Sequence, residues 1–435
     1  MNMSVGEGPK TPVSGRGSPG RISGIDICRS VAILLAMINH VFAEFEVFWA
    51  GQSFLWLKFI STAATPIFVS LFGVMLELVY VERYRNGHAI TATSRLLNRA
   101  GQCYILYVIT VIALVVVGKY TLGFATRTIL LAGMTPYTDI LRFYAVSLLF
   151  APLIIWVRIR FGLIALFAFL FFVHLAYPIL KMIPAPEPIL GRDLLGPIVG
   201  FLYGGGHSGI GAPSLLHGLT FVVGGMIIGS AFGKLLYGNQ RERRQALLIL
   251  GGLMLLGATA VISLWSGLDH VLQATDHSTY RNDNHPFYYA VGLVLTILAT
   301  SVCVYLFDVR GYRWADGVTF IGKTSLFTFA FGNMVLYLQT LGPSSGAGKF
   351  VIVTACVAFI ILQSWLFFKL SSKEQAPANR LWIVASRAVK TLISTAGARI
   401  GELVTPIAIR YAAAMGYAAS GDGTPANAAV QRASA

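Results

Sequence analysis

The sequence predicts an all-α integral membrane protein with about ten transmembrane helices and with both termini in the cytoplasm. Three observations support this fold class: the composition, ten long apolar segments and an uneven distribution of Lys and Arg. Of the 435 residues, 56% are hydrophobic and 12% are charged, whereas soluble globular proteins carry roughly 25% charged residues. The composition excludes a soluble enzyme, a disordered protein and a nucleic-acid-binding domain, and it predicts membrane lipids as the surroundings of the chain.

Ten segments have the roughly 20 mostly apolar residues that a membrane-spanning helix needs. They cover residues 24–48, 54–82, 93–117, 138–157, 161–181, 213–237, 245–266, 286–307, 317–340 and 349–370. The connections between them are mostly short. Together they predict one transmembrane domain over residues 23–371.

Lys and Arg predict the orientation of these segments, because cytoplasmic loops carry an excess of both residues. With the N-terminus inside, the inner loops and tails hold 23 of the 33 Lys and Arg residues, and the outer loops hold 6. The same bias accounts for the net charge of +15. It favours a multi-pass protein whose two termini both lie in the cytoplasm.

The two ends of the chain differ from the transmembrane domain in composition. Residues 1–22 are rich in Gly, Pro and Ser, and we expect a disordered cytoplasmic segment there. Residues 372–435 are the predicted cytoplasmic tail. From Arg380 to about Tyr417 the tail is apolar but interrupted by basic residues, which favours an amphipathic helix on the inner membrane surface over an eleventh span or a loose tail.

Three ionisable side chains of the first span, Asp26, Arg29 and His40, share one helical face. Arg29 and His40 are separated by about three full turns and by about 16 Å along the helix axis. Asp26 precedes Arg29 by one turn, so we expect the two to pair. Charged groups inside a membrane are costly and usually functional. The face therefore predicts a functional ion pair and imidazole, against the alternative of an interfacial pair and a histidine that only links two helices.

This arrangement suits acyl-coenzyme A (acyl-CoA), whose phosphates would bind arginines while its long arm carries the thioester towards His40. Arg95 and Arg99 begin the third span one turn apart, where they can grip phosphates or simply anchor the helix. Lys323 lies near the same side and can join them, or snorkel to the interface. Histidine accepts a proton from a hydroxyl near neutral pH, so we expect His40 to be the base.

A second group of polar residues is predicted to line an acceptor site on the outer side. Its members are Asp139, Arg142, Tyr144, His217, Tyr280, Arg281 and His285. The last three belong to a loop whose hydrogen-bonding groups suit sugar hydroxyls, with a solvated loop as the alternative. We expect no metal, because His277 and His285 lack the close spacing of a zinc site.

Several stretches of the chain resemble the membrane acyltransferase family 3, in the order that the family has them. The spacing of Arg29 and His40, with Asp26 before them, is similar to the family's opening. The run 65–73 resembles its second span, although Phe72 stands where Ser is usual. Further similarities, to its periplasmic-glucan succinyltransferase branch and its neighbours, lie at 139–144 with Pro152, at 284–286 and at 322–326, where Lys323 replaces Arg.

The resemblance implies transfer of an acetyl or succinyl group from cytoplasmic acetyl-CoA or succinyl-CoA to a hydroxyl of a carbohydrate or glycolipid acceptor across the bacterial inner membrane. It implies that His40 is the catalytic histidine, with Arg29 and Asp26 as its partners in the signature. Arg95 and Arg99 would help to bind the donor. The oligomeric state stays open.

Two other classes of function are compatible with a chain of this composition. A transporter or flippase would use His40, Glu77 and Arg142 as a proton or substrate pathway, but the sequence shows no inverted repeat of the kind that such proteins contain. A sensor or scaffold would need no aligned histidine and arginine. The aligned histidine and arginine, and the lack of an inverted repeat, favour the acyltransferase.

Overall fold

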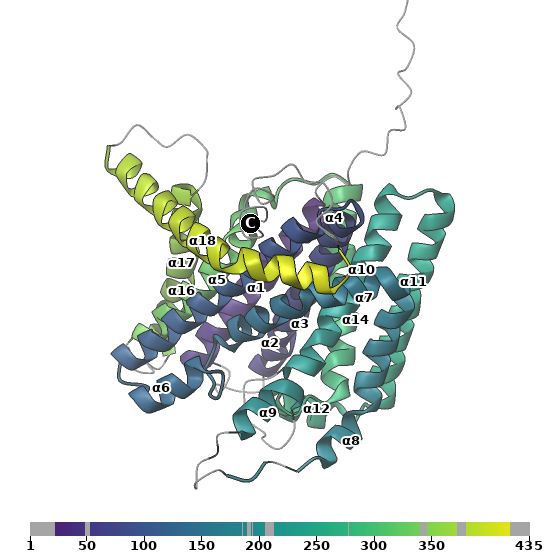
Figure 1. Cartoon of the computed structure of the whole chain (residues 1–435). Coiled ribbons are helices and arrows are strands. Elements are labelled where there is room, and N and C mark those ends of the chain that lie inside the picture. The colour runs from purple at the N-terminus through teal and green to yellow at the C-terminus, as the bar shows by residue number, and fades with distance from the viewer. Residues whose placement is uncertain are drawn as a thin grey trace, which may run out of the picture.

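Every regular element that the structure describes is a helix (Figure 1). The computed structural model describes residues 22–47, 53–184, 186–188, 193, 195–204, 213–276, 278–339, 346–371 and 380–417. Its α-helices are α1 (Ser23–Glu44), α2 (Ser53–Thr62), α3 (Ala64–Met75), α4 (Glu82–Arg85), α5 (Ala89–Val116), α6 (Leu122–Ile129), α7 (Asp139–Leu175), α8 (Tyr177–Met182), α9 (Gly196–Tyr203), α10 (Leu215–Tyr237), α11 (Gln240–Ser263), α12 (Leu268–Asp276), α13 (Thr279–Asn282), α14 (Pro286–Val304), α15 (Thr319–Lys323), α16 (Ser325–Leu338), α17 (Gly346–Ser371) and α18 (Arg380–Ala414). The π-helical turns η2 (Leu76–Val81) and η3 (Tyr305–Val309) follow α3 and α14, and the 3-10 turn η4 (Asp316–Val318) precedes α15.

Nine of the described helical segments are long and apolar enough to cross a membrane. This confirms the prediction of an all-helical, multi-pass membrane protein. The short helices α6, α8, α9 and α12 gather at one end of the bundle, the α12 end, and α4 lies at the opposite end, the α4 end (Figure 1). The distribution of Lys and Arg predicts that the α4 end faces the cytoplasm. The predicted disordered segment, apart from Ile22, and His277 lie outside the described residues.

α7 contains two of the predicted spans, 138–157 and 161–181, because the helix breaks at Gly162. Gly162 has φ 75° and ψ −163°, a conformation that glycine adopts at little cost. Before the break, Arg158 contacts Ser230 late in α10, whereas after it His174 contacts Thr220 early in α10. The chain therefore reverses at Gly162, and the second arm of α7 returns with α8 to the α12 end.

The predicted span over residues 317–340 is divided into α15 and α16. The division brings the five-residue α15 against the first turns of α1, where the Gly322 N–H donates to Ser30 Oγ at 3.0 Å. A side chain at position 322 would overlap Ser30. Only Ser325–Leu338 remains as the long apolar part of this span.

α1 lies at the centre of the bundle and packs against α3, α14, α15 and α16 (Figure 1). Its N-terminus meets η3, the turn that follows α14, where the carboxylate of Asp308 accepts from the N–H groups of Ser23 and Gly24, each at 2.8 Å. A carboxylate at a helix N-terminus satisfies N–H groups that have no partner within the helix. This contact fixes the position of the helix that carries both Arg29 and His40.

The helices α3 and α10 approach each other closely. A Cβ atom at Gly73 would overlap the carbonyl oxygen of Val222, and one at Gly225 would overlap the carbonyl oxygen of Ser70. Small residues allow such close packing in membranes, where dispersion contacts replace the hydrophobic effect between helices. The pair forms a rigid wall behind the central helix.

α18 crosses the bundle rather than running along it (Figure 1). Asn98, near the start of α5, donates to the carbonyl of Gly397 at 3.2 Å, and the ring of Tyr417 lies 5.2 Å from that of Tyr84 in α4. Both contacts lie towards the α4 end. The helix is apolar enough to be one of the nine candidates for crossing a membrane, yet its neighbours place it against the ends and sides of other helices.

Candidate active site

Two cavities lie on either side of one layer of side chains inside the bundle. The His40 cavity has a volume of about 260 Å³ and the Arg29 cavity about 200 Å³. Phe68 of α3, Ile140 of α7 and Phe329 of α16 line both cavities. We call these three side chains the partition. Arg29 and His40, which the sequence places on one face of α1, therefore lie on opposite sides of the partition.

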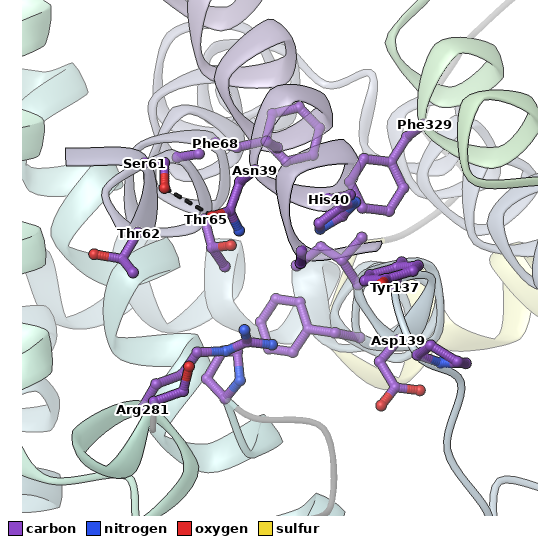
Figure 2. A pocket seen from close by; sticks show the side chains of 18 of the residues that line it. Asn39, His40, Ser61, Thr62, Thr65, Phe68, Tyr137, Asp139, Arg281 and Phe329 are labelled. Atoms are coloured by element: carbon purple, nitrogen blue, oxygen red, sulfur yellow. Dashed lines mark hydrogen bonds between the residues drawn. The ribbon is translucent and has the colours of Figure 1, made fainter. Parts of the chain in front are cut away.

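His40 is held by a hydrogen bond and by two aromatic rings. Its Nδ1 lies 2.8 Å from Oδ1 of Asn333, a fully buried residue of α16. The ring stacks on Tyr137 at 4.9 Å between centroids and meets the edge of Phe329 at 5.5 Å. Figure 2 shows the imidazole between these two rings.

Asn333 determines which nitrogen of His40 carries the proton. The Asn333 amide nitrogen donates to the carbonyl of Phe329 at 2.6 Å, so its oxygen is the atom that faces His40. An amide oxygen only accepts hydrogen bonds, and Nδ1 must therefore be protonated in the neutral ring. The lone pair of His40 is thus on Nε2, the form that a general base needs.

Tyr137 is fixed in turn by groups at the α12 end. Its hydroxyl donates to Oε2 of Glu44 at 2.7 Å, and its backbone N–H donates to the hydroxyl of Tyr337 at 3.2 Å. Burial, and then the neighbouring Glu44 carboxylate, raise the pKa of Tyr137. The phenol therefore stays neutral and donates its hydrogen bond to Glu44, and it supports the imidazole through its ring.

Asn39 lies beside His40 on the same helix and faces the His40 cavity. The hydroxyl of Ser61 donates to Oδ1 of Asn39 at 2.7 Å, as the dashed line in Figure 2 shows. This contact directs the amide nitrogen of Asn39 towards the cavity. The nitrogen can donate to an oxygen that develops negative charge near His40.

Charged groups enter the His40 cavity from its other sides (Figure 2). Oδ1 of Asp139 accepts from the backbone N–H and the hydroxyl of Thr135 at 2.9 Å and 3.1 Å. Arg281 reaches in from α13, and Lys58 lines the cavity from α2. The cavity therefore combines a histidine, hydroxyl and amide groups, a carboxylate and two cations.

The Arg29 cavity lies towards the α4 end and combines two arginines with aromatic and aliphatic walls. Arg29 and Arg99 line it together with Phe72, Tyr144 and residues of α5 and α16. Arg99 also donates to Oε1 of Gln102 at 2.9 Å. The structure thus brings together Arg29 and Arg99, which the sequence predicts to bind the donor.

Two other predicted donor-binding residues lie outside this cavity. Arg95 is exposed one turn before Arg99, outside the lining of the cavity but on its side of α5. Lys323 is also exposed, and its ammonium group lies 5.2 Å from the ring of Phe368. The structure therefore does not bring Lys323 together with Arg29 and Arg99 in this cavity, because α15 turns its side chain towards α17.

Tyr144 and Arg142 do not belong to the predicted acceptor site. Tyr144 is about 7.5 Å beyond Asp139 along α7, which takes it past the partition and into the Arg29 cavity, where its hydroxyl donates to the carbonyl of Phe68 at 2.9 Å. Arg142 is fully buried, bonds the carbonyls of Gly133 and Leu131 and lies 3.4 Å from Asp139. These contacts hold the loop before α7.

Three further residues predicted for the acceptor site lie away from the His40 cavity. His217 is buried and bonds Ser214 at 2.9 Å, and the ring of His285 accepts from the N–H of Phe287 at 3.2 Å at the start of α14. Tyr280 bonds Ser266 at 2.8 Å. Of the predicted acceptor residues, Asp139 and Arg281 alone line the His40 cavity within the described part of the chain. The described residues contain no group of three or more His, Cys, Asp and Glu that could hold a metal ion.

Sequence reasoning missed most of the residues that position His40. In the sequence Asn333 is one polar residue inside an apolar segment, and the sequence does not supply a partner for it. Nothing in the sequence pointed to a role for Tyr137, Ser61 or Glu44, because they lie at or next to the ends of helices, where polar residues are common. Only the folded chain brings them together.

The residues of the alternative transport pathway have separate partners. Glu77 forms a buried ion pair with Arg158, with contacts of 2.6 Å and 3.0 Å. Arg142 is bound to the loop before α7, and His40 to Asn333. The structure thus gives no connected pathway through Glu77, Arg142 and His40 in the part of the chain that it describes.

One family model matches the first part of the chain. The model OpgC_C, described as OpgC protein, matches residues 21–127. The curated proteins gave no match. The matched segment contains Arg29, His40, Phe68 and Arg99, whereas α7 and α16 supply the remaining partition residues and Asn333. The match therefore supports the resemblance to an acyltransferase over residues 21–127, which supply part of the lining of both cavities.

Proposed function

We propose that the protein is a membrane acyltransferase that uses acyl-CoA and transfers an acyl group to a hydroxyl of a carbohydrate or glycolipid acceptor. The observation that carries this proposal is the placement of two arginines and one oriented histidine on opposite sides of a single partition. The similarity of residues 21–127 to the OpgC protein supports the same activity.

The donor would bind from the α4 end, which we propose to be cytoplasmic. Arg29 and Arg99 line the cavity on that side, with Arg95 exposed on the same stretch of α5. Guanidinium groups bind phosphates through paired hydrogen bonds, so they suit the phosphates of coenzyme A. The reactive arm would then pass the partition to reach His40.

The chemistry would take place in the His40 cavity. Nε2 of His40 takes the proton of the acceptor hydroxyl while that oxygen attacks the thioester carbonyl carbon. The carbon–sulfur bond then breaks, the ester forms, and the coenzyme A sulfur leaves with the proton that His40 returns. The amide nitrogen of Asn39 would donate to the carbonyl oxygen as it becomes negative, a role for which Tyr137 is unsuited because its hydroxyl donates to Glu44.

The topology that fits this proposal has ten crossings of the inner membrane and both termini in the cytoplasm. The two arms of α7 count as two crossings, and α15 with α16 as one. α18 would then lie on the cytoplasmic face, as its contacts near Asn98 and Tyr84 favour. Its basic residues would face the anionic headgroups of the lipids.

The acyl group would be acetyl or succinyl, and two features favour succinyl. First, the match to the OpgC family model supports the resemblance to the glucan succinyltransferase branch. Second, two cations, Arg281 and Lys58, line the His40 cavity. A succinyl group carries a free carboxylate, which would need a cation at a site that excludes water.

The decisive experiment measures donor binding and acyl transfer separately. Detergent-purified protein should melt at a higher temperature with coenzyme A, and Arg29→Gln with Arg99→Gln should remove this shift. His40→Ala should keep the shift yet lose at least about 100-fold in transfer of a radiolabelled acyl group to glucan, because a general base contributes about 100-fold or more. His270→Ala, at an exposed position of α12, is the control. Transfer that survives in His40→Ala would overturn the proposal.

A further inference from the structure

A third cavity lies outside the proposed active site, between the second arm of α7, α8, α10, α11 and α14. Its volume is about 490 Å³, within the range of about 300–1,000 Å³ that small-molecule sites usually have. We call it the His174 cavity. It shares no lining residue with the His40 cavity or the Arg29 cavity, so the proposed function gives it no role.

The cavity changes from polar to apolar along the direction of the helices. His174, Thr220 and His285 line it near the α12 end. Leu293 lines it further along α14, about 12 Å beyond His285, together with Leu256 of α11. This gradient matches a molecule with a polar head and a hydrocarbon chain.

The side of the cavity that faces away from the bundle is apolar. Phe171, Leu175 and Leu256 line it and are 52%, 60% and 42% exposed. In a membrane an apolar exposed surface of this kind faces the hydrocarbon, where polar groups would be costly. A ligand would therefore enter sideways from the lipid rather than from water.

The hydrogen bonds of His174 define what the head of such a ligand must offer. The hydroxyl of Thr220 donates to the carbonyl of His217 at 2.6 Å, so its oxygen accepts from Nε2 of His174 at 3.1 Å. In a neutral imidazole the other nitrogen is then an acceptor. That nitrogen, Nδ1, is buried and has no hydrogen-bond partner among the described residues. A ligand that satisfies it must provide an N–H or O–H group.

The rim of the cavity carries one charge of each sign. The ammonium group of Lys181 lies 3.4 Å from Oδ2 of Asp283 and 5.7 Å from the ring of Tyr177, which lines the cavity. Both charged side chains are partly exposed, at 48% and 31%. A zwitterionic headgroup complements such a pair, because its phosphate can meet Lys181 while its ammonium group meets Asp283 and donates to His174.

We infer that the His174 cavity binds a phospholipid with a primary ammonium headgroup, such as phosphatidylethanolamine, whose acyl chain fills the apolar part. Phosphatidylcholine has the same charges and chains but no N–H group. Phosphatidylglycerol has a hydroxyl donor but no cation. Comparing the three lipids therefore shows whether the cavity recognises the N–H group of the head, the positive charge of the head, or only the acyl chain.

The test uses a phosphatidylethanolamine analogue with a photoreactive diazirine in its acyl chain, incubated with the full-length protein in detergent. Labelling should map to peptides of the second arm of α7 and of α11. Unlabelled phosphatidylethanolamine should compete about tenfold better than phosphatidylcholine, as one hydrogen bond to a charged group predicts. Phosphatidylglycerol should compete less well than phosphatidylethanolamine. Equal competition by all three would show a chain without a recognised head and would overturn the inference.

Two variants locate the site. Ala260→Trp fills the cavity and should abolish labelling, whereas Leu255→Trp, at a position of α11 that is 69% exposed and outside the cavity, should not change it. If Ala260→Trp melts abnormally, Ala290→Leu on the facing helix serves the same purpose. His174→Leu should keep the labelling but lose the preference for phosphatidylethanolamine. Unchanged labelling in a folded cavity-filling variant would contradict the inference, and none of these measurements requires acyl transfer.

Discussion

Nδ1 of His40 lies 2.8 Å from the amide oxygen of Asn333, although the two residues are 293 positions apart in the sequence. Asn333 is fully buried and fixed by its own bond to Phe329. The helix α16 therefore sets both the tautomer and the ring orientation of a histidine on α1. A residue outside the cavity thus controls the proposed catalytic base.

We expect Asn333→Leu to reduce acyl transfer by about 100-fold, because His40 would lose the bond that holds its ring in place and keeps the proton on Nδ1. Asn333→Asp should recover much of the activity, since a carboxylate oxygen also accepts from Nδ1. Steady-state transfer rates at saturating donor, with coenzyme A binding as the control for folding, check this. Equal rates for the two variants would mean that Asn333 has only a packing role.

The partition predicts a variant that separates donor binding from transfer. Ile140→Trp enlarges a side chain that lines both cavities, so it should obstruct the passage of the thioester arm. We expect the melting shift with coenzyme A to persist while transfer falls by about 5–150-fold, since overpacking a closed site costs about 1–3 kcal/mol. Loss of the shift as well would show that the partition belongs to the donor site alone.

The sequence predicted the fold well because its strongest signals are local. Apolar length identifies helices without any long-range contact, and Lys/Arg counts predict the side of the membrane for each loop. The same reasoning explains why Arg29 and His40 could be placed relative to each other: their spacing along one helix fixes their face and depth. The break at Gly162 also lies close to the predicted boundary, since the sequence predicts a connection over residues 158–160.

The acceptor side could not be predicted because it depends on how separate helices meet. Tyr144 and Asp139 are close in sequence, yet the partition places them in different cavities. His217 and Arg142 looked like ligand-binding residues because they are polar, but each is bound in part by its own surroundings: Ser214 bonds Nδ1 of His217, and the carbonyl of Gly133 accepts from Arg142. Polarity inside a membrane identifies a residue that needs a partner and does not say whether that partner is protein or substrate.

The cations of the His40 cavity predict the choice of acyl donor, provided that the proposed function holds. Arg281→Gln should lower the ratio of kcat/KM for succinyl-CoA over acetyl-CoA by about 10–100-fold, because a charge-assisted hydrogen bond to the free carboxylate is lost. Arg281→Lys should restore part of the ratio. Parallel assays with both donors measure it. A ratio that stays constant while both rates fall would place Arg281 on the acceptor instead.

The buried pair of Glu77 and Arg158 predicts a loss of stability without a loss of chemistry, since both residues lie outside the two cavities. Glu77→Gln should destabilise the protein by about 3–5 kcal/mol, because Arg158 is left as an unpaired buried charge. The double variant Glu77→Met with Arg158→Met should melt closer to the unchanged protein than Glu77→Gln does, since it removes both charges. Thermal unfolding and transfer per folded molecule check this. A Glu77→Gln protein that melts normally but transfers no acyl group would instead place the pair in a functional pathway.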